Sequence, residues 1–295
     1  MGVKTADTAQ VVATAIRDVS HIATLPEITL RIVELVESPS STAQDLHNVI
    51  SNDPALCSRI LKVVNSSFYG MPGQIGSINR AIVLLGLNAV KNIAISASLS
   101  KLFKGGQLCP AFAAKDLWRH SVATAATCKV MADVLKLGLP DEAFLAGLMH
   151  DIGIMVAMQH DRNKLIEIIN SLGVGNDGVP TADMLEAETR VFGATHQDFG
   201  KGLCEKWKFP KTLGLVAGAH HNPLSMPEDQ RTLPALVNVA DRLAAEADVG
   251  FRLDLASFAI EPAILDVIKL NKDKVESIKK GLPEKILEVQ SILTG

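Results

Sequence analysis

Hydrophobic residues recur along most of the chain with the three- and four-residue spacing of one helix face, and the two-residue alternation typical of strands is scarce. Helix start signals agree with this pattern. Asp53 followed by Pro54 predicts an N-cap and a first turn, where the missing proline N–H has no consequence. Ser77 predicts the cap of one further helix over residues 78–99. We therefore predict an all-α fold.

The same signals place the later elements. Residues 139–160 predict one helix that starts at a Pro–Asp pair, with Asp141 as its cap. Residues 273–293 predict an amphipathic pair of helices, broken at Gly281–Pro283. Gly- and Pro-rich stretches predict loops at residues 70–77, 104–110 and 172–180.

We place a boundary near residue 112. It separates an N-terminal helical bundle, residues 1–112, from a larger helical unit, residues 113–295, in which five of the eight histidines lie close to apolar sequence. The pattern is compatible both with two units that pack tightly against each other and with two independent domains.

Composition narrows the function classes. Of the 295 residues, 47% are hydrophobic and 4% aromatic, and the net charge is −3, which gives no general attraction for nucleic acid or an anionic membrane. The apolar stretch 81–99 is interrupted by polar residues, and the N-terminus lacks the apolar segment of a secretion signal. We expect a cytoplasmic protein without nucleic-acid or membrane partners. Four cysteines form no CxxC pair and are expected to be buried hydrophobes: Cys57, Cys109, Cys128 and Cys204.

The segment AGLMHDIGIM, residues 146–155, places His150 and Asp151 side by side in an apolar run that predicts a buried helix. Burying an unpaired carboxylate costs several kcal/mol or more. A divalent cation bound by both side chains would remove this cost. A core aspartate that accepts hydrogen bonds, next to a neutral histidine, explains the dipeptide equally well.

Other positions favour the cation. On the helix predicted around residues 115–135, Asp116 and His120 share a face that continues with small, uncharged residues, so it is expected to be covered by protein. His196 lies in FGATHQDFGKGL, among small residues that permit close helix approach. The alternative for His196 is an ordinary surface position on a helix.

His220 and His221 end a helix of small residues, GLVAGAHHNP, that Pro223 stops. Without a metal, they would simply stabilise the negative end of the helix dipole. Asp241 lies inside the apolar part of the segment ALVNVADRLAAEAD, which favours a buried acid. Asn238 on the same helix face is also compatible with an exposed Asp241.

Together these residues supply a mixed imidazole and carboxylate set that suits Fe, Mn, Zn or Ni better than Ca or Mg. Six such ligands would suffice for two ions, with Asp151 as the natural bridge. The remaining histidines lie in more polar sequence and are expected at the surface: His21, His47 and His160.

Over residues 20–245 the chain resembles the HDOD family, relatives of the HD and HD-GYP phosphohydrolases. In the first unit the resemblance rests on residues 25–93, from LPEITLRIVEL to LNAVKNI. In the second it rests on LWRHSVATA, AFLAGLMHDIGI, THQDFGKGLCEKWKFP and AGAHHNP. It implies an all-α fold, with an N-terminal helical bundle packed against an HD-like core.

By this similarity, the four positions of the H…HD…D metal set are occupied by His120, His150, Asp151 and Asp241. The additional ligands that would hold a second metal are His196, His220 and His221, and Asp116 matches the place of a further acid. Two features of the phosphohydrolases are missing. Ile154 stands where they commonly have lysine, and LSMPEDQRT follows HHNP without the Gly-Tyr-Pro segment tied to cyclic di-GMP cleavage.

These departures favour a bacterial signalling module with a divalent metal site, one or two ions, and unidentified protein partners. The alternative is a metal-dependent phosphohydrolase acting on a nucleotide, cyclic dinucleotide or phosphomonoester. In that case Asp151 would be the catalytic metal bridge, and Arg119 or Lys201 would bind the phosphate. Phe68 and Tyr69 are expected to pack inside the bundle, and contact with a partner is the alternative.

Overall fold

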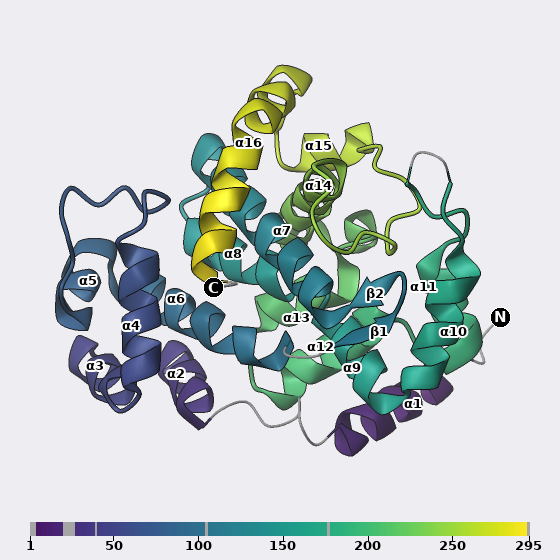
Figure 1. The fold of residues 1–295 in the computed structure, drawn as a ribbon, viewed down its shortest axis with the longest axis horizontal. Helices are drawn as coiled ribbons and strands as arrows, with labels where there is room; N and C mark the ends of the chain where they lie inside the picture. Colours follow the sequence, from purple (N-terminus) through teal and green to yellow (C-terminus); the bar gives the residue numbers. More distant parts are fainter. Residues whose placement is uncertain (1–3, 20–26, 39, 104–105, 176–177, 294–295) are drawn as a thin grey trace.

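The computed structural model describes residues 4–19, 27–38, 40–103, 106–175 and 178–293 (Figure 1). His21 lies outside these residues. The first part of the chain is helical, as predicted. Its elements are α1 (Lys4–Asp18), α2 (Glu27–Glu37), α3 (Ala43–Ser51), α4 (Pro54–Val64), α5 (Ile78–Leu85), α6 (Leu87–Leu99) and the 3₁₀ turn η1 (Ser100–Phe103).

The predicted caps of this part are present. The Asp53 side chain accepts a hydrogen bond from Leu56 N at 2.9 Å, and Ser77 accepts one from Arg80 N at 3.2 Å. The single helix predicted over residues 78–99 is wrong. Gly86, with φ of +90°, ends α5 and begins α6, a conformation that glycine adopts without Cβ strain.

The second part is also helical, with a small antiparallel hairpin that begins within the predicted loop at residues 104–110 and ends at residue 113. Its elements are β1 (Gln107–Cys109), β2 (Phe112–Ala113), α7 (Ala114–Leu135), α8 (Pro140–Met149), α9 (Ile152–His160), α10 (Arg162–Leu172), α11 (Met184–Phe192), α12 (His196–Lys206), α13 (Lys211–Ala219), η2 (Pro223–Ser225), η3 (Glu228–Gln230), α14 (Thr232–Glu246), α15 (Pro262–Val267) and α16 (Lys272–Leu293).

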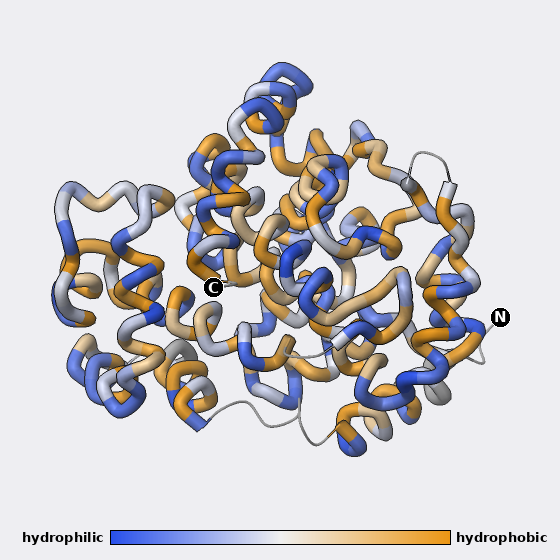
Figure 2. Tube along the Cα trace, viewed as in Figure 1, coloured by the Kyte–Doolittle hydropathy of each residue, from blue (hydrophilic) through white to orange (hydrophobic). Residues whose placement is uncertain are grey.

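Three predictions about these helices are wrong. Residues 139–160 form two helices, α8 and α9, and the cap position of α8 is Leu139. Asp141 instead accepts a hydrogen bond from the Tyr69 hydroxyl at 3.3 Å. The predicted break at Gly281–Pro283 is absent, because α16 continues through Pro283. Its apolar stripe, which alternates with hydrophilic positions in Figure 2, stays buried on both sides of the proline and offsets the lost hydrogen bond.

Helix α7 lies at the centre of the second part and packs against α8, α14 and α16, while α12 packs against α13 and α9. Helix α1 lies against α12 and α9, on the opposite side of the molecule from α3, α4 and α5 (Figure 1). One continuous cluster of buried hydrophobic residues includes side chains from both parts. The boundary at residue 112 stays a prediction, although α1 packs with the second part.

Phe68 and Tyr69 are partly buried against the core. Phe68 packs against Phe144, with ring centroids 6.1 Å apart, and meets Tyr69 in an edge-to-face contact. Three of the four cysteines are buried, and Cys57 is partly buried. Within the described ranges, no helix is both long and apolar enough to cross a membrane.

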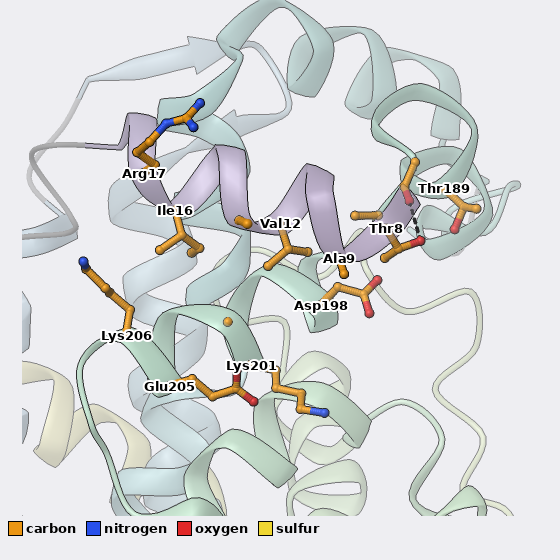
Figure 3. A pocket seen from close by; sticks show the side chains of 14 residues that line it. Thr8, Ala9, Val12, Ile16, Arg17, Thr189, Asp198, Lys201, Glu205 and Lys206 are labelled. Carbon is orange, nitrogen blue, oxygen red and sulfur yellow. Dashed lines mark hydrogen bonds between the residues drawn. The ribbon is translucent and has the colours of Figure 1, made fainter. Parts of the chain in front are cut away.

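A cavity of about 990 Å³ is lined by residues of α1, α11 and α12 (Figure 3). At its floor, a Cβ added to Gly202 would lie 2.6 Å from Cγ1 of Val12. We expect Gly202→Leu to displace α1 at a cost of about 1–2 kcal/mol, which corresponds to roughly tenfold faster amide exchange in α1. Hydrogen–deuterium exchange measures this. Gly76→Leu is the control, because a Cβ at Gly76 meets nothing within 4 Å.

Candidate metal centre

The structure brings all seven predicted ligands together. They come from helices that are separate in the sequence: α7, the break between α8 and α9, the first turn of α12, the end of α13, and α14. Six have side chains with no exposed surface, and His221 is 7% exposed. In chain order they are His120, His150, Asp151, His196, His220, His221 and Asp241.

The break between α8 and α9 explains how neighbouring residues share one centre. Along a continuous helix, adjacent side chains diverge by about 100°. At Asp151 the backbone leaves the helical region, with φ of −98° and ψ of 12°. His150 Nε2 then lies 3.3 Å from Asp151 Oδ2, so both side chains face the same space.

Asp151 is surrounded by imidazoles on one side of the cluster. Its Oδ1 lies 3.3 Å from His220 Nε2 and 3.6 Å from His196 Nε2, and His196 Nε2 lies 3.0 Å from His221 Nε2. One ligand atom from each of these four residues lies within 4.8 Å of the others. The four donors therefore form a first candidate set for an ion.

A second set adjoins the first. His120 Nε2 lies 2.9 Å from Asp241 Oδ1, and His150 Nε2 lies 3.7 Å from the same oxygen. Ligand atoms of these three residues are again within 4.8 Å of one another. Because His150 also contacts Asp151, the two sets are contiguous and offer room for one or two ions.

Hydrogen bonds behind the imidazoles fix their tautomers. His150 Nδ1 donates to the Gly147 carbonyl at 2.7 Å, and His220 Nδ1 donates to the Val216 and Ala217 carbonyls at 3.2 Å. A carbonyl only accepts, so in the neutral ring the proton sits on Nδ1 and the Nε2 lone pair faces the cluster.

Glu188 does the same for His196. Its Oε2 accepts from both the backbone N and the Nδ1 of His196, at 2.9 and 2.8 Å. The sequence does not mark this residue, because a glutamate on an amphipathic helix gives no sign of burial. The structure shows it fully buried on α11.

Burial and the neighbouring carboxylates shift the pKa values of the cluster histidines in opposite directions. Burial lowers the pKa of His150, but the Asp151 carboxylate outweighs it and raises that pKa to about 10. Burial likewise opposes a charge on His196, and Glu188 raises the pKa of His196 to about 9. Burial and the neighbouring imidazoles hold the pKa of His221 well below its usual value.

The residues fit a divalent transition metal. Several buried polar atoms in the cluster have no hydrogen-bond partner among the residues that the structure describes, which is costly unless another group satisfies them. These atoms are His150 Nε2, His220 Nε2, Asp151 Oδ1 and Oδ2, Asp241 Oδ2, and both carboxylate oxygens of Asp254. Imidazole nitrogens and carboxylate oxygens are the donors that Zn, Fe, Mn and Ni accept.

Three residues considered from the sequence lie away from the cluster. Asp116 pairs with Arg119 at 3.3 Å on the surface, where their side chains are 34% and 54% exposed. Lys201 is exposed and lines the cavity beside α1 (Figure 3). The expectations of an acidic ligand at Asp116 and of a phosphate contact at Arg119 or Lys201 find no support in these positions.

Glu188→Gln provides a test of the orientation of His196. Glutamine has the same shape but loses the carboxylate charge, so the basicity and the positioning of the imidazole both weaken. We expect the affinity for a divalent metal to fall about 10- to 100-fold. Isothermal titration of the metal-free protein measures the affinity. Glu186→Gln, at an exposed position of the same helix, is expected to match the unchanged protein.

The all-α bundle buries His120, His150, Asp151 and Asp241 in one cluster. The chain belongs to the HDOD family: the HDOD domain model matches residues 22–223. Among curated proteins, one relative is an uncharacterised protein of Treponema pallidum (strain Nichols), to which the chain is 24% identical over 224 residues. This match covers 76% of the chain but 42% of that relative, so the chain spans less than half of its length.

Solved structures share the fold. An HDOD domain protein of unknown function from Geobacter sulfurreducens superposes with a TM-score of 0.79 at 22% identity, covering 97% of this chain and 98% of that one. A protein from Shewanella amazonensis SB2B, provisionally named a phosphohydrolase, gives 0.72 at 23% identity, with 95% and 98% covered. One from Marinobacter aquaeolei VT8, provisionally named a signal transduction protein, gives 0.75 at 22% identity, with 98% and 66% covered.

Proposed function

We propose that this chain is a regulatory HDOD protein whose His/Asp cluster binds one or two divalent transition-metal ions, Fe, Mn, Zn or Ni, as a structural clamp. Ligands from α7, the α8–α9 break, α12, α13 and α14 would tie five segments together. Since the unfolded chain offers no preformed site, metal binding adds to folding stability. The output would pass to protein partners in a signalling system.

The burial of the ligands carries this proposal. A catalytic metal needs an open coordination position that a substrate can reach. Here the side chains of six ligands are fully buried, and His221 is 7% exposed. The space where phosphohydrolases commonly place a lysine holds Ile154, which is also completely buried. Both features suit a metal that stabilises the bundle.

A metal-dependent phosphohydrolase is the second candidate, supported by the number of donors. A metal bound at Asp151 would lower the pKa of a coordinated water and polarise a phosphate oxygen. Arg242, partly buried beside His221, hydrogen-bonds the Asn238 and Ala259 carbonyls and is a cation that a phosphorylated small molecule could meet. Such a substrate would have to enter past His221.

One set of measurements separates the two candidates. Metal analysis of the purified chain is followed by assays with a generic phosphomonoester, nucleotides and cyclic dinucleotides. We expect bound metal and no turnover. Turnover that disappears in His150→Ala, with the fold retained by circular dichroism, would establish the phosphohydrolase instead. A chain that binds none of the four metals would refute both.

A further inference from the structure

We infer that Asp254, a residue outside the family's H…HD…D pattern, is the acidic ligand that completes the second ion site of this chain. The inference rests on the proposed function, because it assumes that the cluster binds metal. It assigns to a loop residue the role that sequence similarity suggested for Asp116.

Asp254 lies where the two ligand sets meet. Its carboxylate forms one candidate group with His120 and Asp151, and another with His221 and Asp241. In each group the ligand atoms lie within 4.8 Å of one another. Asp254 Oδ2 lies 3.8 Å from His221 Nε2. Asp254 is therefore close to donors from both sets.

Nothing else in the described structure accounts for this carboxylate. Its side chain has no exposed surface, and neither of its oxygens has a hydrogen-bond partner among the described residues. It is placed near two further acids, Asp151 and Asp241, whose negative charges oppose its own. A buried carboxylate with two free oxygens and acidic neighbours is stabilised by a cation.

The loop that carries Asp254 is built to reach the cluster. At Gly250, with φ of +76°, an added Cβ would lie 2.3 Å from the Asp116 carbonyl oxygen and 2.6 Å from His120 N, so the loop backbone touches α7. The next residue, Phe251, donates its N–H to the Asp116 carbonyl at 3.0 Å and packs edge-on against Phe112. This anchor brings the loop over the turn of α7 that bears His120.

Leu253 and Leu255, on either side of Asp254, are buried and fix the loop against the protein interior. Asp116, by contrast, directs its carboxylate away from the cluster. Its carbonyl is engaged by the loop, and its side chain points outward to Arg119. Asp254, thirteen residues after Asp241, thus lies in the cluster, and the side chain of Asp116, one turn before His120, does not reach it.

The test is metal stoichiometry in the full chain. Unchanged protein, Asp254→Asn and the matched control Asp116→Asn are freed of metal by chelation and titrated separately with Mn²⁺, Fe²⁺ and Zn²⁺. Bound ions are counted by mass spectrometry after desalting, and folding is followed by circular dichroism and thermal unfolding. Asparagine keeps the shape of an uncharged aspartic acid, so a purely structural carboxyl would tolerate it.

We expect two ions per unchanged chain, and one ion, or a second ion bound at least tenfold more weakly, in Asp254→Asn. Asp116→Asn should bind two. Without metal, Asp254→Asn should unfold at the same or a higher temperature than the unchanged chain, because asparagine replaces a carboxyl that is costly to bury beside Asp151 and Asp241. The inference is overturned, and the proposed function is left standing, if Asp254→Asn binds as many ions as the unchanged chain and with the same affinity. The same holds if the unchanged chain binds one ion, or if only Asp116→Asn loses an ion. An unchanged chain that binds no metal would overturn the proposed function as well.

Discussion

Asp151→Ala is expected to reduce bound metal to less than about a tenth of that in the unchanged chain, because Asp151 contacts imidazoles on both sides of the cluster. Metal held at about 1,000 times its dissociation constant stabilises a fold by about 4 kcal/mol, or roughly 10 °C in melting temperature. Adding a chelator should lower the melting temperature of the unchanged chain by that amount and leave Asp151→Ala unaffected. Calorimetry with metal analysis measures both.

The control for Asp151→Ala is Asp116→Ala, which removes a surface acid from the helix that bears His120. It should keep its metal and its response to chelator. If Asp151→Ala retains a full complement of ions and still melts earlier with chelator, the ligands lie elsewhere in the protein.

Gly153→Ala is expected to destabilise the fold by more than about 3 kcal/mol, because the added methyl has no space. Its Cβ would lie 1.8 Å from the His196 carbonyl oxygen and 2.6 Å from Gly200 N, both backbone atoms that cannot rotate away. Helices α9 and α12 would have to separate, and with them Asp151 and His196. Denaturant unfolding measures the loss, and metal affinity should fall with it.

Gly281→Ala is the matched control, since Gly281 is also helical but a Cβ there meets nothing within 4 Å. That substitution should stabilise the fold by about 0.5–1 kcal/mol, because alanine loses less backbone entropy on folding. A Gly153→Ala protein as stable as the unchanged chain would mean that α9 and α12 do not approach as closely as described.

The sequence predicted the helical class and several helix ends because these depend on local chemistry. Asp53 and Ser77 cap helices through bonds to residues three positions on, and such bonds are visible in the residue order. The breaks at Gly86 and at His150–Asp151 were missed. A glycine within a helical pattern is compatible with either a helix or a turn, and the turn at Asp151 is stabilised by contacts from distant helices.

The candidate ligands followed from a different kind of signal. A histidine or acid inside an apolar run is costly to bury, and that cost marks His120, His150, Asp151 and Asp241 in the sequence itself. Glu188 gave no such signal on its amphipathic helix. Asp254 gave none either, in a loop whose path depends on the contact of Gly250 with α7.

The sequence by itself therefore determined which elements form and which side chains need a partner, since hydrophobic period, caps and the cost of buried charge are properties of short segments. The tertiary structure decided which partners meet. Helices α7, α12, α13 and α14 place donors from four distant segments around Asp151, and a loop places Asp254 among them while Asp116 faces outward. The distances between these side chains depend on how whole helices and loops pack together, and no local sequence pattern encodes that packing.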